Sequence, residues 1–205
     1  QKYLVPLQQK GIKVILGILC NHDRACCTRL GDEAARKFAR ELKAKLEAYE
    51  LDGVFFDDEY CNRGDYPGFT TYNNFSRLCY EVRKAMPNAL IQAYVYSGTS
   101  SCGPVEGMQP GEFVTQAIQD YGRYYDLESD YPGLPKSGMI QASSEFARGS
   151  IISENRARQI VTDGYGGTMI FSLNPNNGYV YRFNNITIPF YGEETVQTGS
   201  YAKDW

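Results

Sequence analysis

The sequence predicts a parallel α/β fold, either a barrel or a doubly wound sheet. The main observation is an alternation: apolar segments of strand length take turns with longer segments whose apolar residues recur every three or four positions. The second is that one strand-like segment, residues 51–59, ends in three consecutive acids. Strands and helices in alternation imply parallel strands with helices outside them.

Six segments have the length and composition of strands. Each is a short apolar run rich in β-branched or aromatic residues and bounded by turn-forming residues. Gly11 separates the first of them from residues 2–10, which have the pattern of a helix end. The six predicted strands cover residues 13–19, 51–59, 90–96, 113–119, 139–143 and 168–173.

Amphipathic helices are predicted between these strands. Residues 32–49 place their apolar side chains on one face, and Asp32 is the expected N-cap. Residues 75–85 and 154–163 show the same period. The tail, residues 174–205, is rich in Asn, Gly and Tyr and is expected to hold a final helix or a β-ribbon.

A closed (β/α)8 barrel of the TIM type needs eight strands in typically about 250 residues, two more than are predicted here. The chain opens in the middle of the pattern, so we expect the first two βα units to be missing from its N-terminal end. Residues 1–205 show no internal boundary or repeat and would form a single barrel domain, strands three to eight plus the tail. Because an incomplete barrel exposes strand edges, we expect a second chain or segment to complete it.

Composition indicates a soluble globular domain and excludes some partners. The chain has 205 residues, of which 42% are hydrophobic, and a formal net charge of -3, so no basic surface for nucleic acid is expected. No run of about 18 apolar residues predicts a membrane span. Residues 1–10 are polar, so any export signal has been removed or lies upstream.

The six cysteines are an even number, which permits disulfides in an exported protein. We therefore expect a secreted, periplasmic or cell-surface location. Zinc is the alternative, because His22 lies near two cysteines, although no Cys-x-x-Cys spacing supports it. The spacing does not reveal the pairing. Four cysteines follow predicted strands and are expected at one end of the fold: Cys26, Cys27, Cys61 and Cys102.

Function is predicted from the strand that ends Phe-Phe-Asp-Asp-Glu-Tyr. Side chains alternate across a strand, so Phe55, Asp57 and Glu59 share one face. Phe56 and Asp58 share the other. Two neighbouring carboxyls repel each other, and partial burial adds to the effect, so one of them keeps its proton near neutral pH and can act as a general acid. A solvated acidic strand end or a cation site is the alternative interpretation.

The same stretch resembles a known signature. Asp52-Gly-Val-Phe-Phe-Asp-Asp-Glu-Tyr60 is similar to the Asp-Gly-x-Asp-x-Asp-x-Glu signature of family 18 glycoside hydrolases, and more narrowly to the endo-β-N-acetylglucosaminidases of the Endo H type. In that family the signature lies on the fourth barrel strand, which agrees with two missing units. The likeness covers nearly the whole chain and includes Leu7-Gln-Gln-Lys-Gly-Ile-Lys-Val, Asn21-His22, Met86-Pro87, Ile91-Gln-Ala-Tyr94 and Gly164-Tyr-Gly-Gly167.

The resemblance implies a retaining hydrolase that cuts the β-1,4 bond of the di-N-acetylchitobiose core of N-linked glycans. In this family the N-acetyl oxygen of the substrate is the nucleophile, and an oxazolinium ion forms. Glu59 would protonate the glycosidic oxygen and then activate water, while Asp57 would orient the acetamide. A downstream tyrosine commonly helps to hold the acetamide, and Tyr121 is the better match, with Tyr94 next.

The resemblance also implies the residues that bind the sugar. Asn21 and His22 match the Asn-His pair that follows the third strand of the family, and Tyr94 and Tyr60 are further candidates. For Tyr94, Tyr121 and His22, an ordinary structural role is the alternative. The expected partner is an N-linked glycan or glycoprotein, and neither a metal ion nor an organic cofactor is required.

One position departs from the signature, because Phe55 stands where the family has its first inward Asp. That carboxyl ordinarily shares a proton or a hydrogen bond with the next one, here Asp57, so its loss changes how Asp57 is oriented and charged. An apolar neighbour would also desolvate Asp57 and raise its pKa. We expect lower activity or a shifted pH optimum, and not inactivity.

Two further functions stay open. The first is a glycan-binding module on the same barrel with weak or no catalysis, which Phe55 favours and the intact Glu59 disfavours. The second is a chitinase, which would favour a Trp near the end of the last strand, whereas the one Trp of this chain is Trp205.

Overall fold

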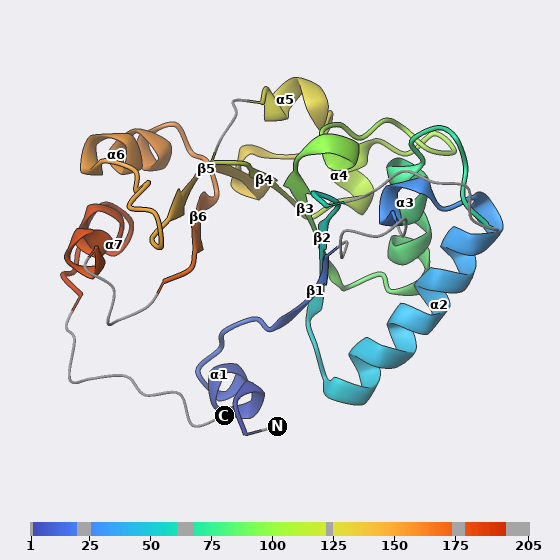
Figure 1. Ribbon diagram of the computed structural model, residues 1–205, viewed down its shortest axis with the longest axis horizontal. Helices are drawn as coiled ribbons and strands as arrows, with labels where there is room; N and C mark the ends of the chain where they lie inside the picture. Colours follow the sequence, from blue (N-terminus) through green and yellow to red (C-terminus); the bar gives the residue numbers. More distant parts are fainter. Residues whose placement is uncertain (1, 20–25, 61–67, 122–124, 174–178, 196–205) are drawn as a thin grey trace. The chain divides into compact units, whose positions relative to one another are not determined.

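The computed structural model describes residues 2–19, 26–60, 68–121, 125–173 and 179–195 (Figure 1). The chain divides into two compact units. The first comprises Gln1–Ala117 with Tyr125–Leu134, and the second comprises Ile118–Tyr124 with Pro135–Trp205.

The predicted α/β alternation is confirmed. The six strands follow one another in the sheet in chain order. β1 pairs with β2, β2 with β3 and β5 with β6, each pair in parallel orientation. The strands are β1 (Ile15–Leu19), β2 (Gly53–Asp57), β3 (Leu90–Val95), β4 (Gln116–Gln119), β5 (Met139–Glu145) and β6 (Gly167–Phe171).

The predicted helices are also present, and the tail contributes a final helix. The α-helices are α1 (Leu4–Gln9), α2 (Asp32–Tyr49), α3 (Phe75–Ala85), α4 (Pro110–Phe113), α5 (Leu127–Asp130), α6 (Glu154–Thr162) and α7 (Asn184–Tyr191). Short 3-10 turns form at η1 (Cys27–Arg29), η2 (Ser97–Thr99), η3 (Lys136–Gly138) and η4 (Val180–Phe183).

In the first unit, helices α2 and α3 lie on the same side of strands β1 to β3 (Figure 1). Phe56 of β2 is fully buried there. Its ring centroid lies 6.3 Å from that of Phe38 on α2 and 5.8 Å, edge-on, from that of Phe75 on α3. Phe56 therefore belongs to the helix-side core, as the strand alternation predicts, and Phe55 belongs to the opposite face.

Several details of the prediction are wrong. The strand predicted over residues 51–59 is Gly53–Asp57, so Glu59 lies after its end. The fourth strand begins at Gln116 and not at residue 113, because a helical turn precedes it. Pro110 stands at the start of that turn, and the side chain of Glu112 accepts a hydrogen bond from the backbone of Gln109, which favours a helix start. The N-cap of α2 is the residue before Asp32, so Asp32 begins the helix proper.

In the second unit, α6 and α7 pack beside strand β6. A small apolar core forms around Phe146, Ile151 and Ile186, with Ile170 of β6 and Phe183 against it. Ring centroids of Phe146 and Phe183 lie 5.9 Å apart, edge-on. The final helix is therefore held by contacts with residues that follow β5.

Strand β5 carries a bulge at Ala142. Ile140 lies opposite Gly167 of β6, but Ser143 lies opposite Met169, so β5 has one residue more than its partner over this stretch. Ala142 takes up the difference with a φ of 73°, in the left-handed region that residues other than glycine rarely adopt.

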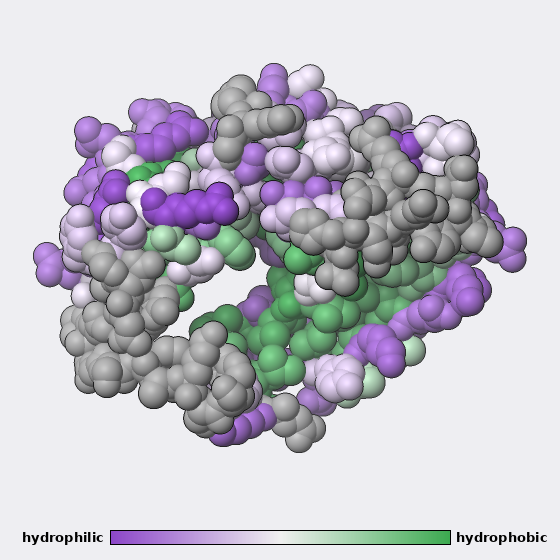
Figure 2. Space-filling model, in the orientation of Figure 1, coloured by the Kyte–Doolittle hydropathy of each residue, from purple (hydrophilic) through white to green (hydrophobic). Residues whose placement is uncertain are grey.

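Apolar side chains reach the surface of the first unit around β1 (Figure 2). Leu19, at the end of β1, is 57% exposed, and Ile12 is 48% exposed. In the described part of the chain, no helix has both the length and the apolar character needed to cross a membrane.

Candidate active site

Two of the three acids lie together at the carboxyl end of β2. Asp57 is the last residue of the strand, and Glu59 follows two residues later; both are half-buried. The backbone N–H of Glu59 donates to Oδ1 of Asp57 over 3.0 Å. This bond orients the Asp57 carboxylate. It also closes the short turn that presents both carboxyls at the strand end, where parallel α/β proteins carry their sites.

The third acid, Asp58, points the other way. It is 1% exposed. Its Oδ1 accepts the backbone N–H of Cys27 over 3.1 Å, and its Oδ2 accepts the hydroxyl of Thr28. A solvated acidic strand end, the alternative to a catalytic site, does not describe this residue. Its carboxylate is used to hold the segment that follows β1.

Aromatic rings cover the site face of β2 and β3. The rings of Phe55 and Tyr94 have centroids 6.2 Å apart and are tilted, and Tyr94 stacks on Tyr96 at 6.4 Å with an interplanar angle of 12°. Tyr94 is 3% exposed, so its ring is a packing element of this unit. The predicted site did not include Tyr96, although the predicted strand 90–96 contains both Tyr94 and Tyr96 at a spacing of two, which places them on one face.

The remaining predicted site residues have different outcomes. Tyr60 follows Glu59 directly and is 39% exposed, so it is available at the rim of the strand end. Tyr121 lies two residues after β4 and is half-buried, in the second unit. That Tyr121 lies close to Glu59 therefore stays a prediction. Asn21 and His22 lie outside the described residues.

The loop that follows β3 is attached to α3. Glu106 and the glycine after it form the tip of a tight turn in which Val105 and Met108 are bridged. The Glu106 carboxylate accepts the Tyr80 hydroxyl over 2.6 Å and Arg77 over 2.5 Å. These hydrogen bonds, the Tyr80 bond first, hold the pKa of Glu106 below its ordinary value. The loop thus has a defined shape and is fixed to α3.

The described cysteines have two kinds of partner. Cys26 is in a disulfide bond. Cys102, in the loop after β3, forms a hydrogen bond with the thiol of Cys79, which comes from helix α3. The expected gathering of four cysteines at one end of the fold stays a prediction, because Cys61 lies outside the described residues. Burial raises the pKa of the Cys79 thiol well above its ordinary value. Among the described residues, no three His, Cys, Asp or Glu side chains gather in a metal-binding arrangement.

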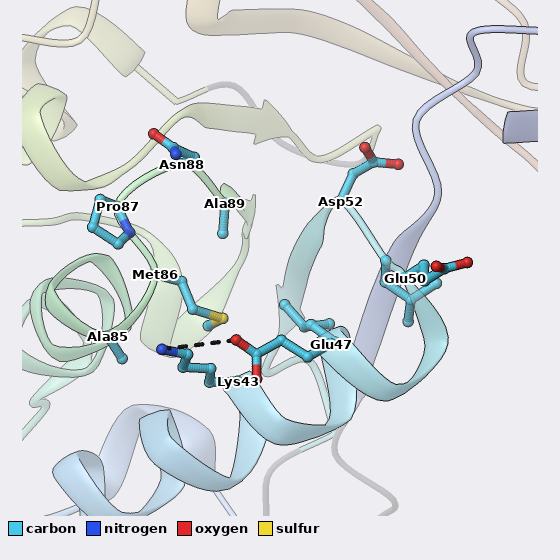
Figure 3. A pocket seen from close by; sticks show the side chains of 11 residues that line it. Lys43, Glu47, Glu50, Asp52, Ala85, Met86, Pro87, Asn88 and Ala89 are labelled. Atoms are coloured by element: carbon cyan, nitrogen blue, oxygen red, sulfur yellow. Dashed lines mark ion pairs between the residues drawn. The ribbon is translucent and has the colours of Figure 1, made fainter.

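A cavity of about 410 Å³ lies at the other end of β2 and β3 (Figure 3). Its wall includes Leu46, Met86 and Asp52, and the ion pair of Lys43 and Glu47, 3.7 Å apart, borders it. Asp52 precedes β2, whereas Asp57 and Glu59 lie at its carboxyl end. The cavity is therefore separate from the acids, and the acids mark the candidate site.

The fold and the site define the chain as a parallel α/β protein with two carboxyls at one strand end. A fungal endo-beta-N-acetylglucosaminidase from glycosyl hydrolase family 18 shares this fold, with a TM-score of 0.59 at 14% identity over 93% of this chain and 76% of that one. EndoBT-3987 of Bacteroides thetaiotamicron, solved with a Man5GlcNAc product, has a TM-score of 0.80 at 32% identity over 92% of this chain and 45% of that one.

A curated relative extends the similarity over the whole chain. Endo-beta-N-acetylglucosaminidase F1 of Elizabethkingia meningoseptica is 49% identical over 215 aligned residues, which cover 100% of this chain and 63% of the relative. No protein-family profile matches the chain. The resemblance is confirmed, since the chain is similar over its whole length to a curated endo-beta-N-acetylglucosaminidase. It spans somewhat less than two thirds of the length of that relative, 63%.

Proposed function

We propose that this protein is an endo-β-N-acetylglucosaminidase that hydrolyses the β-1,4 bond of the di-N-acetylchitobiose core of N-linked glycans. The observation that carries the proposal is the pair Asp57 and Glu59 at the carboxyl end of β2, joined by the bond from the Glu59 backbone to the Asp57 carboxylate. The names of the relatives support it: two are endo-beta-N-acetylglucosaminidases, and EndoBT-3987 was solved with a Man9GlcNAc2Asn substrate.

The roles of the two carboxyls follow from their chemistry. Glu59 protonates the glycosidic oxygen as the bond breaks, and then takes a proton from the attacking water. Asp57 accepts the N–H of the substrate acetamide, which turns the acetamide oxygen toward the anomeric carbon and stabilises the oxazolinium ion. The product retains its configuration, because the acetamide oxygen and the water attack the same carbon in turn.

Other residues complete the proposed site. Tyr121 would hold the acetamide together with Asp57, and Tyr60 would line the sugar site with Asn21 and His22. Tyr94, which is buried, would support this face through its contacts with Phe55 and Tyr96. Aromatic side chains suit this role, since a ring face packs on a sugar while a hydroxyl bonds to it.

We also propose the wider context of the chain. Its strands would be the third to the eighth of a closed (β/α)8 barrel, with a further segment or a second chain beside β1. The exposed apolar residues around β1 support a partner there. The disulfide at Cys26 supports export to a secreted, periplasmic or cell-surface location.

The test is glycan release from a high-mannose glycoprotein by the full-length protein, read by mass. Cleavage should leave a single N-acetylglucosamine on the protein and should fall at least about 1,000-fold in Glu59→Gln, because the proton donor is lost. The matched control is Glu41→Gln on the exposed face of α2, which should retain full activity.

The alternatives give different results in the same experiment. Binding of the glycan without cleavage by the full-length parent would favour a glycan-binding module. Release of oligosaccharides from chitin, with no cleavage of the glycoprotein, would favour a chitinase. The chitinases among the similar structures share 12 to 17% identity with this chain, so they support the fold alone.

A further inference from the structure

We propose that Asp58 is a positioning residue for the hydrolysis: it holds the end of β2, and with it Asp57 and Glu59, against the segments that follow β1 and β3. This rests on the proposed function, because the carboxyls that it positions are those assigned to the reaction. The family signature leaves this position open as an x.

The first support is the set of bonds that Asp58 accepts. Its side chain is 1% exposed, as is that of Thr28. Oδ1 accepts the backbone N–H of Cys27 over 3.1 Å and the Cys27 thiol over 3.3 Å, while Oδ2 accepts the Thr28 hydroxyl. A carboxylate is buried at acceptable cost only when donors surround it, so this one can occupy a single position.

The second support comes from the segment after β3. Gly98, in the turn η2, packs directly on the bonded pair. A Cβ added at Gly98 would lie 2.9 Å from Oδ2 of Asp58 and closer still to the hydroxyl of Thr28. Asn73 donates to the carbonyl of Gly98 over 2.5 Å, which ties the same turn to the segment before α3. The segments that follow β1 and β3 thus meet at the Asp58 carboxylate, and Asn73 holds the second of them in place.

The position of Asp58 in the chain links its hydrogen bonds to the proposed chemistry. It stands between Asp57 and Glu59, whose backbone-to-carboxylate bond spans it. Fixing the middle residue fixes the backbone on both sides, so the spacing of the two carboxyls from a substrate depends on Asp58. A misplacement of about 1 Å can lower a rate about 100-fold.

Kinetics of the full-length protein test the proposal. Asp58→Asn keeps the size but offers one acceptor oxygen in place of two. It should lower kcat about 10- to 100-fold and change KM less than about threefold. Thr28→Val should lower kcat in the same direction, and Thr28→Ser, which keeps the hydroxyl, should restore most of it. The double variant Thr28→Val with Asp58→Asn should be no slower than Asp58→Asn alone, because both changes break the same hydrogen bond.

A matched control separates positioning from plain loss of stability. Val82→Ala removes methyl groups from a fully buried side chain on α3 and should lower the melting temperature without changing kcat at assay temperature. The proposal is overturned if the kcat of Asp58→Asn is within twofold of that of the parent. It is also overturned if this kcat falls no further than the kcat of Val82→Ala when the two variants are equally stable. A rise in KM at constant kcat would also overturn it.

Amide hydrogen exchange gives a readout that does not depend on activity. Exchange in a peptide covering residues 53–60 should be about tenfold faster in Asp58→Asn than in the parent, and unchanged in Val82→Ala. If the parent cleaves no glycan, the proposed function fails, and this measurement still decides whether Asp58 holds the strand end. Equal exchange in parent and Asp58→Asn overturns the proposal.

Discussion

Replacement of Phe55 by aspartate tests how the two carboxyls are controlled. Phe55 and Asp57 share one face of β2, and with a rise of about 3.3 Å per residue they stand about 6.6 Å apart. Two full charges at that distance repel each other by about 2.5 kcal/mol at an effective dielectric constant of about 20. One carboxyl of the pair would therefore keep a proton near neutral pH and could donate it in a hydrogen bond to the other.

The same change removes a ring. The contact between Phe55 and Tyr94, with centroids 6.2 Å apart, is worth about 0.5 to 1.5 kcal/mol. The variant should thus be less stable by at least that amount, because the burial of the half-buried ring is lost as well, but still folded. Because the new carboxyl would orient Asp57 for the acetamide, we expect kcat to rise about tenfold, equivalent to about 1.4 kcal/mol of transition-state stabilisation.

The assay is the initial rate of glycan release from a high-mannose glycopeptide between about pH 4 and pH 8, for the full-length parent, Phe55→Asp and Phe55→Asn. The asparagine variant is the control, since it has the same size and no charge. The reasoning is refuted if Phe55→Asp is no faster than the parent at any pH. Equal rates for the two variants would show that space, and not the carboxyl pair, limits the reaction.

Three further predictions concern the frame around the site. A Cβ on buried Gly53 would lie 2.7 Å from two atoms of Leu90 in β3. Gly53→Ala should therefore lower the free energy of unfolding, measured in urea, by roughly 1 to 3 kcal/mol. Gly17→Ala is the control and should lower it less, because a Cβ there would have nothing within 4 Å. The pKa of Glu106 is lowered, chiefly by Tyr80, so its bonds stabilise the fold above the ordinary carboxyl pKa and are lost as the pH falls through the folded value. Glu106→Gln should accordingly lower Tm more at about pH 7 than at about pH 3, and equal effects would contradict this. The raised pKa of Cys79 predicts alkylation by iodoacetamide at least roughly tenfold slower in the folded protein than in a free peptide; equal rates would show an accessible thiolate.

Local pattern was enough to predict the strands and the face on which the acids lie. The apolar run before Asp57 reads as a strand because its residues suit a buried, extended backbone, and the alternation of side chains then separates Asp57 and Glu59 from Asp58. What holds Asp58 could not be predicted. Its donors, Cys27 and Thr28, come from about 30 residues earlier in the chain, and period alone does not say which distant segments meet.

The prediction was wrong where a short helical turn formed in a segment whose apolar composition suggested a strand. The apolar residues from Phe113 onward suggested a strand, but the turn that begins at Pro110 takes Phe113 into a helix. The pairing of the cysteines was left open by their spacing, and the contact of Cys102 with Cys79 from a helix joins segments that no local pattern relates. Whether Tyr121 lies near Glu59 depends on contacts between distant segments, which a local sequence pattern does not reveal.

The bulge in β5 has a consequence for comparing this chain with its relatives. Because Ala142 is an added residue, Ser143 and the residues after it occupy the faces that a regular ladder would give to their neighbours. Deletion of Ala142 would then not simply shorten the strand. It would turn Ser143, Ser144 and Glu145, which are all buried here, over to the opposite faces of the strand. A gap at this point in an alignment therefore marks a change in the face of the strand on which the following side chains lie. It does not mark a change in loop length.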